Sequence, residues 1–427
     1  MRLVLDHVLR RGSCQLLLII VFLATTVVAD PGQPETVVSP AVVNVTWPEI
    51  VRLVDQHPRI SAGKFQVEAA RGAVSAAGAV PNPTLEATVG QGRERVNGDT
   101  HVEWDMTLTI PFDWVAQRSS RIDSARAEVA IAEAEADSLR RDVLLQLRTL
   151  FWDLAYEQEL VMSLEALEAQ TAALLATVNK RIEKGEARPV EALQVEVERE
   201  KVVSELESAR ISLSARRAEL ALWLGIPKNG ALAVVADLGQ LPIAKDLDTA
   251  LSLAHKTHPA FAAAQARTNF LEADLVTEKM ARVPSFSLSA FTASEADQRV
   301  FGAGIGVDLP LWNWNSGRVT QAEAKLAAGQ KQAEDAAFEV ETIIINAQAA
   351  CSASASTAIR YSEKVTPRAE SAAATMEKIY QLGEASILEV IDTRRTLLES
   401  RRLYLSTVAQ AQIDCNRLDT LIGAELK

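Results

Sequence analysis

Two carboxylates lie three residues apart near the C-terminus of the sequence, directly after a glycine-containing turn. Glu389 and Asp392 share one face if this segment is helical, and Glu191 occupies the matching place in an earlier, similar segment. Grouped carboxylates attract cations, and the crowding of like charges raises the pKa of some members. Most helical Glu and Asp residues are simply solvated, so the spacing is also typical of three ordinary surface acids.

The histidines and cysteines offer less chemistry. His255 and His258 are three residues apart, but no cysteine or acidic cluster accompanies them, so no metal site is predicted. Cys351 and Cys415 are symmetric about Gly383, so an antiparallel hairpin turning there would bring them to one level. Export permits a disulfide. However, packed helices are about 8–10 Å apart and a disulfide needs Cα atoms within about 7 Å, so a disulfide and buried free thiols are both open.

The sequence has no pattern typical of an enzyme. We find no nucleophile with a base, no phosphate-binding loop and no metal constellation, so neither catalysis nor a cofactor is predicted. The 427 residues carry a formal net charge of −12, and an acidic chain repels phosphate, which argues against nucleic-acid binding. The composition, with 48% apolar and 23% charged residues, is that of a folded protein, and length alone suggests two or three globular domains.

The N-terminus has the pattern of a secretory signal. Arginines precede an apolar run over residues 16–29 that ends at the small residue Ala29. The run is shorter than the ~20 residues that a membrane-spanning helix needs, which disfavours the alternative of a membrane anchor. We predict a signal peptide over residues 1–29 and an extended tail over residues 30–45. We expect no later segment to be apolar enough for a transmembrane helix.

The remaining sequence contains two copies of one unit of about 200 residues, since five short matches occur in the same order at nearly constant spacing. We predict a first repeat over residues 46–226, a linker over residues 227–246 and a second repeat over residues 247–427. The clearest matches are His57-Pro58 with His258-Pro259, Ile110-Pro111-Phe112 with Leu309-Pro310-Leu311, and Gly185-Glu186-Ala187 with Gly383-Glu384-Ala385.

Each repeat contains two segments in which apolar and polar residues alternate, as they do in strands. The alternation suits tilted membrane strands and a sheet on a soluble core equally well. Two facts favour the membrane: neither repeat offers an apolar layer to cover a sheet, and Trp114, Trp312 and Trp314 lie just past the strand ends, where an interfacial aromatic belt would be. The predicted strands are at about 83–90, 102–111, 285–292 and 301–310.

Long helices follow the strands in both repeats. Neither Gly nor Pro lies between Pro111 and Gly185, a stretch rich in good helix formers. A helix of about 70 residues would be about 100 Å long, which exceeds the roughly 55 Å diameter of a compact chain of this size. The second repeat has a similar stretch over residues 315–381, in which Pro367 predicts a bend. The predicted turns between the long helices are 184–186 and 382–385.

The combination of signal, duplication, strands and helical hairpins resembles the TolC family of outer-membrane efflux ducts. The most specific stretch is 380–392, which is similar to the tip of that family's second hairpin. Leu309-Pro310-Leu311 and Pro367 also fit, and Pro81-Asn82-Pro83 resembles the heavy-metal efflux branch, which is CzcC-like. The resemblance covers residues 46–426.

The resemblance implies a mainly α-helical homotrimer in which four strands per chain form a 12-stranded β-barrel in the outer-membrane lipid and the helices form a tunnel in the periplasm. It implies a passive efflux channel that receives substrate from an inner-membrane pump and a periplasmic adaptor. For the heavy-metal branch the substrate would be divalent metal cations. The alternatives are a duct for small organic compounds, a type I secretion duct, or a periplasmic coiled-coil scaffold without a pore.

The resemblance also implies roles for individual residues. Acidic residues at the places of Glu389 and Asp392 line the family's periplasmic pore constriction, and Glu191 is their counterpart in the first repeat. Three-fold symmetry would turn each into a ring of carboxylates that favours cations. The turns would contact the adaptor, although helix capping alone would also explain their residues. The candidate adaptor contacts are Gly185, Gly383, Glu384, Ala385 and Ser386.

Overall fold

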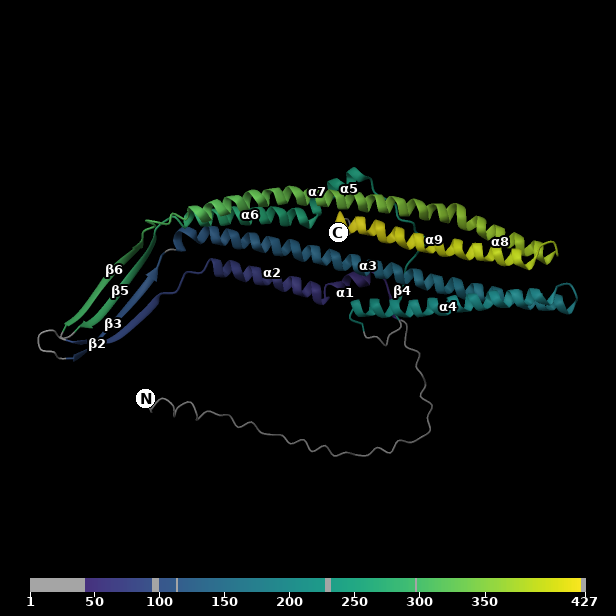
Figure 1. The fold of residues 1–427 in the computed structure, drawn as a ribbon, viewed down its shortest axis with the longest axis horizontal. Helices are drawn as coiled ribbons and strands as arrows, with labels where there is room; N and C mark the ends of the chain where they lie inside the picture. Colours follow the sequence, from purple (N-terminus) through teal and green to yellow (C-terminus); the bar gives the residue numbers. More distant parts are fainter. Residues whose placement is uncertain (1–42, 94–99, 113, 227–231, 296–297, 424–427) are drawn as a thin grey trace, which may run out of the picture. The chain divides into compact units, whose positions relative to one another are not determined.

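The computed structural model describes residues 43–93, 100–112, 114–226, 232–295 and 298–423, which belong to one compact unit. The predicted signal peptide and most of the predicted tail lie outside the described residues. The two repeats contain the same kinds of helix and strand in the same order (Figure 1). After β1 (Val43–Val45), at the end of the predicted tail, the first repeat consists of α1 (Trp47–Val54), α2 (Pro58–Ala77), β2 (Thr84–Arg93), β3 (Thr100–Pro111), α3 (Trp114–Glu183) and α4 (Pro189–Trp223).

The second repeat follows a short strand, β4 (Leu232–Val234), in the predicted linker. Its elements are α5 (Leu247–Thr257), α6 (Pro259–Met280), β5 (Ser285–Glu295), β6 (Gln298–Asp308), α7 (Ser316–Arg360), the π-helical turn η1 (Tyr361–Val365), α8 (Thr366–Gln381) and α9 (Ile387–Leu421).

The strand β4 links the end of the predicted tail to the predicted linker. Val43–Val45 pairs in parallel with Leu232–Val234, and the side chain of Gln158 both donates to the Val234 carbonyl and accepts from its N–H. The end of the tail is therefore tied to the linker and to α3.

The four predicted strands are present and form one antiparallel sheet in the order β2, β3, β5, β6. Each strand continues two or three residues farther toward its hairpin loop than the alternation indicated. The central pair, β3 and β5, joins the two repeats: Trp104 lies opposite Ser294 and Pro111 opposite Ser287.

The register places apolar side chains of all four strands on one face of the sheet. Leu85 lies opposite Leu108, Ile110 lies opposite Leu288, and Leu288 lies opposite Ile305. The opposite face carries mainly Ser, Thr, Gly and acidic residues. The apolar face is open to the surroundings in the single chain. Its exposed members include Leu85, Val89, Val102, Met106, Leu108, Phe286, Leu288, Phe301, Ile305 and Val307.

The tryptophans beyond the strands differ in their surroundings. Trp312 and Trp314 follow β6 and are 92% and 61% exposed, while Trp114 begins α3, is partly buried and donates from Nε1 to the Pro111 carbonyl. Two of the three predicted belt residues are therefore exposed just beyond the end of β6.

The long helix of the first repeat, α3, is unbroken over 70 residues, which corresponds to about 105 Å. It packs against α2, α4, α6 and α9. One window of this helix reaches a mean hydropathy of 1.2 and is long and apolar enough to cross a membrane by length and composition alone. The expectation that no later segment would pass that test was therefore wrong. The same helix also buries Leu147 and Leu154 in the core of the first repeat.

The long helix of the second repeat is interrupted where the sequence predicted a bend. The π-helical turn Tyr361–Val365 lies directly before Thr366 and Pro367. Proline has no N–H to donate, and its ring crowds the carbonyl four residues earlier, that of Glu363. A wider helical turn accommodates both effects, so η1 is the local consequence of Pro367.

Cys351 on α7 and Cys415 on α9 are joined by a disulfide, and their Cα atoms are 4.5 Å apart. Free thiols would be expected if α7 and α9 were at the usual distance between packed helices, about 8–10 Å. Here Ala347 and Ala355, one turn before and after Cys351, are buried in the same cluster. Small side chains let α7 and α9 approach closely enough for the bond.

Candidate functional site

Both helical hairpins turn back at a glycine in the left-handed conformation. Gly185 and Gly383 have φ values of 75° and 83°. The residue after each glycine closes the last helical turn: the Glu186 N–H donates to the Arg181 carbonyl at 2.8 Å, and the Glu384 N–H donates to the Ile379 carbonyl at 3.1 Å. A residue with a Cβ is strained in this conformation, which explains why glycine recurs at both turns.

The candidate adaptor contacts lie at these turns. Gly185, Gly383, Glu384 and Ser386 are exposed, whereas Ala385 is half-buried against the apolar cluster beneath the turns. Ser386 also caps α9, so this residue is a helix cap and is exposed at the same time.

Glu389 is engaged in this cap. Its carboxylate accepts hydrogen bonds from the Ser386 N–H at 2.7 Å and from the Ser386 hydroxyl at 2.9 Å, and the hydroxyl in turn accepts from the Glu389 N–H. The bonds from Ser386 lower the pKa of the Glu389 carboxyl below its ordinary value. Within one chain Glu389 is therefore held as an anion. In a ring of like charges the opposite shift is expected, because neighbouring carboxylates raise the pKa.

Asp392 lies one turn farther along α9 and is exposed. Together with Glu389 it lines a groove of about 640 Å³ between α4 and α9. The aliphatic part of the lining is exposed as well: Leu193 and Val197 on α4 and Leu388 on α9 are 59%, 57% and 56% exposed. The groove therefore combines an apolar wall with the carboxylates of Glu389 and Asp392, and Glu198 and Arg395 line it as well.

Glu191 is directed elsewhere. Its side chain is only 15% exposed, accepts from the Arg188 N–H at 3.3 Å and pairs with the Arg188 guanidinium at 3.6 Å. The Tyr380 hydroxyl of α8 donates to its other oxygen at 3.5 Å. The structure thus brings Glu389 and Asp392 together, as the sequence predicted, and places Glu191 in a contact between α4 and α8.

Sequence reasoning missed the arginines that join the two hairpins near the turns. The guanidinium of Arg181 on α3 lies 4.8 Å from the centre of the Tyr380 ring and donates to the Tyr380 carbonyl at 3.0 Å. Arg394 on α9 donates to the Gln170 carbonyl of α3 at 3.2 Å and to Glu377 of α8 at 3.1 Å. The adjacent pair Arg394-Arg395, just after Asp392, was the available signal.

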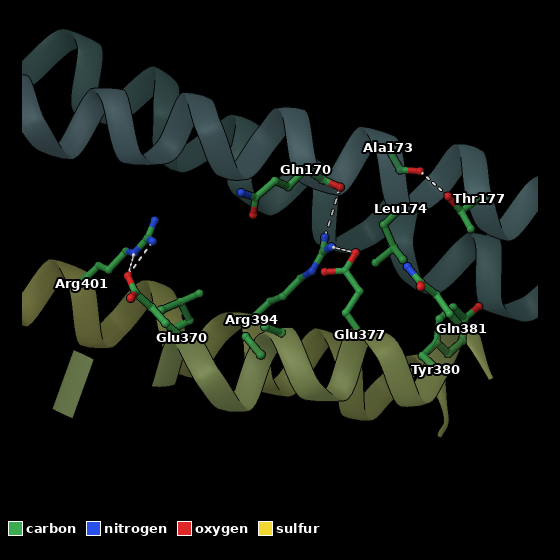
Figure 2. Close-up of a pocket in the computed structure, with 13 residues that line it drawn as sticks. Gln170, Ala173, Leu174, Thr177, Glu370, Glu377, Tyr380, Gln381, Arg394 and Arg401 are labelled. Atoms are coloured by element: carbon green, nitrogen blue, oxygen red, sulfur yellow. Dashed lines mark hydrogen bonds and ion pairs between the residues drawn. The ribbon is translucent and has the colours of Figure 1, made fainter. Parts of the chain in front are cut away.

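A second cavity, of about 450 Å³, lies between α3, α8 and α9 (Figure 2). Arg394 reaches across it toward Gln170 and Glu377 (Figure 2). Farther from the hairpin turn, Arg401 pairs with Glu370 at 2.7 Å. The cations of this cavity are thus matched by carboxylates. It lies on a different side of α9 from the groove that holds Asp392.

The recurring His-Pro pair proves to be a helix start. The Nδ1 atom of His57 accepts from the Arg59 N–H at 3.2 Å, and that of His258 accepts from the Ala260 N–H at 3.3 Å. Burial lowers the pKa of both imidazoles, which keeps Nδ1 available as an acceptor. His255 instead pairs with Glu341 at 3.1 Å. The three histidines are therefore used in capping and pairing contacts.

The chain is similar to known proteins over most of its length. The model of the family described as "Outer membrane efflux protein" matches residues 50–226 and 250–424, one stretch in each repeat. The Cobalt-zinc-cadmium resistance protein CzcC of Cupriavidus metallidurans is 26% identical over 368 residues, which cover 85% of this chain and 86% of that protein.

Solved structures show the same fold. CusC, described in connection with transmembrane channel formation, matches with a TM-score of 0.75 at 17% identity, over 90% of this chain and 93% of its own. The outer membrane protein VceC from Vibrio cholerae matches with a TM-score of 0.72 at 18% identity, over 88% of this chain and 96% of its own. Because the family model covers most of both repeats, the chain belongs to the outer membrane efflux protein family.

Proposed function

We propose that this protein is the outer-membrane channel of a tripartite efflux system and works as a homotrimer. The observation that carries the proposal is the four-stranded sheet with one exposed apolar face. Such a face suits lipid, and lipid tolerates no open strand edges. The edges of this sheet, β2 and β6, have no partner strand among the described residues. Three copies would supply 12 strands, which suffices for a closed barrel.

The helical hairpins would then continue the pore into the periplasm, with their turns toward the inner membrane. We propose that the exposed turn residues receive a periplasmic adaptor that connects the channel to an inner-membrane pump. Glu384 and Leu382 are both exposed at the second turn and offer a charge beside an apolar side chain. Nothing in this arrangement requires a reaction, so the channel would conduct passively.

We propose divalent heavy-metal cations as the cargo. Two lines support this: a relative that covers most of the chain is named for cobalt, zinc and cadmium resistance, and Glu389 and Asp392 line one groove near the turns. In a trimer each would form a ring of three carboxylates, and acidic rings in narrow pores favour cations.

Conductance across a planar lipid bilayer tests the channel. We expect purified protein to form cation-selective pores whose current depends on divalent cations. The double variant Glu389→Gln and Asp392→Asn should lower the cation selectivity; glutamine is used because it can still cap α9. Glu334→Gln, an exposed carboxylate paired with Lys331, is the control. The absence of conductance in the unmodified protein would favour a scaffold without a pore.

The cargo and the adaptor need separate tests. Cells that lack the gene should become sensitive to zinc, cobalt or cadmium, and resistance only to organic compounds on complementation would favour an organic-compound duct. A photo-cross-linker at Glu384 should capture the adaptor, while one at Lys331 on α7 should not. Capture from Lys331 alone would contradict docking at the turns.

A further inference from the structure

Arg395 on α9 forms a two-point ion pair with Glu198 on α4. Its Nε donates to one carboxylate oxygen at 2.7 Å, and its second nitrogen donates to the other oxygen. The Glu198 side chain is 13% exposed, whereas Arg395 is 51% exposed. A bidentate pair of this kind fixes the plane of the guanidinium as well as its position. Arg395 is therefore an exposed cation whose direction is set by a shielded anion.

This ion pair lies in the same groove as Asp392. Glu198, Arg395, Glu389 and Asp392 all line it. Asp392 precedes Arg395 by three residues on α9, which places the two on neighbouring turns of one face. The hydrogen bond with Glu198 is the main cause that raises the pKa of Arg395, and the charge of Asp392 adds to it. Glu389 is turned toward Ser386. Arg395 thus has two anions within its reach but is bonded to one of them.

We propose that Glu198 holds Arg395 away from Asp392 and that this pair sets the cation selectivity of the constriction. The inference rests on the proposed pore and deepens it by adding two specificity-determining residues. While Arg395 is bonded to Glu198, its positive charge is compensated there. Asp392 and Glu389 then have no arginine bonded to them, and each chain contributes these two carboxylates to the constriction. Without Glu198, Arg395 can pair with Asp392, and the constriction loses part of its negative charge.

The two single variants are expected to act in opposite directions. Glu198→Gln should reduce the cation-to-anion permeability ratio, because Arg395 is released toward Asp392. Arg395→Gln should increase the ratio, because a cation is removed and Glu198 remains. A unit charge a few ångströms from a permeating ion in water changes its occupancy by about two- to fivefold, which is the size of shift expected. The double variant restores the charge balance and should return close to the unmodified ratio.

The direction of these shifts separates a charge role from a structural one. Loss of the contact between α4 and α9 would move both single variants the same way, and the double variant would then resemble them. The matched control is Glu370→Gln and Arg401→Gln, which break another two-nitrogen ion pair of α9 on the side of the second cavity (Figure 2). We expect no change in selectivity from either control.

The experiment is a measurement of reversal potential for the full-length protein in planar bilayers under a salt gradient. Each variant is first checked for its helical circular dichroism and oligomeric state in detergent. Shifts of opposite sign for Glu198→Gln and Arg395→Gln, with recovery in the double variant, support the inference. Unchanged shifts, or shifts of the same sign in both single variants, overturn the inference. If Asp392→Asn still lowers the cation selectivity in that case, the proposed pore stands. No conductance in the unmodified protein overturns both the inference and the proposed pore.

Discussion

The two repeats contain the same elements in the same order, but they hold their long hairpins together differently. The core of the first repeat uses large side chains such as Leu147, Phe151 and Leu220, around an unbroken α3. The core of the second repeat consists mostly of small side chains and is closed by the Cys351–Cys415 disulfide, beside a long helix that η1 interrupts. Turn geometry and element order were thus conserved between the copies, while the means of packing diverged.

The strongest test of this contrast removes the disulfide. Replacing Cys351 and Cys415 with Ser should destabilise the second repeat by about 4 kcal/mol, because the bond closes a loop of 64 residues. Hydrogen exchange should show lost protection in α7 and α9 and little change in α3 and α4. Equal loss of protection in both hairpins would show that the repeats are not separately stabilised.

Substitution of Arg141 tests whether a side chain of the first repeat stabilises the helix ends of the second repeat. This buried side chain of α3 donates to the Thr257 carbonyl at 2.8 Å and to the Thr420 carbonyl at 3.4 Å, at the last turns of α5 and α9. Arg141→Met should cost about 3 kcal/mol in chemical denaturation, since buried carbonyls lose a charged donor. Arg140→Met, which breaks a more exposed pair with Asp55, should cost under about 1 kcal/mol. Similar losses would contradict the assignment.

The histidine caps predict loss of stability in acid. Burial lowers the pKa of His57, with Arg59 nearby, and that of His258, which faces Arg141 and Asp137. The unfolded chain therefore takes up protons first, so this stability is complete above about pH 6.5 and declines as the pH falls toward the lowered folded-state pKa.

The acid effect should be greater for the second repeat, because burial is the main cause of both lowered pKa values and His258 is more deeply buried than His57. Asn at either position can cap without titrating. Denaturation midpoints at pH 8 and pH 5 should therefore converge more for His258→Asn than for His57→Asn. Undiminished acid sensitivity in the double variant would exclude the caps as its source.

The smallest effect concerns Pro367. Because the π-helical turn already accommodates the missing N–H and the ring of Pro367, Pro367→Ala should change stability by under about 1 kcal/mol. Amide protection across residues 361–366 should rise, since a regular helix can then form. A large loss of stability would mean that packing, rather than the proline, requires the π-helical turn.

Much of the fold is encoded locally and was predictable for that reason. Alternation identified the four strands, the long stretch without Gly or Pro identified α3, and paired glycines identified both turns. Each of these patterns depends on neighbours within a few residues. Strand ends were less well defined, because the polar residues that continue each strand resemble those of a loop.

The candidate site was predictable only in part. Helical spacing sufficed to bring Glu389 and Asp392 together. The turning of Glu191 toward Tyr380, the pairing of Arg395 with Glu198 and the closeness of α7 and α9 depend on how distant helices pack, which spacing along the chain does not report. The short pairing of β1 with β4 was missed for the same reason.

The pairing of β3 with β5 also determines when the sheet can form relative to synthesis of the chain. The hairpin of β2 and β3 ends at Pro111, but the sheet is complete only once Asp308 has been made. At about 5–20 residues per second, synthesis leaves a delay of about 10–40 s. A two-stranded ribbon is marginal in water, so the first hairpin gains its full stability only when β5 pairs with β3. Glu86 and Asp105, charges within its strands, discourage pairing with a stray hairpin while it waits.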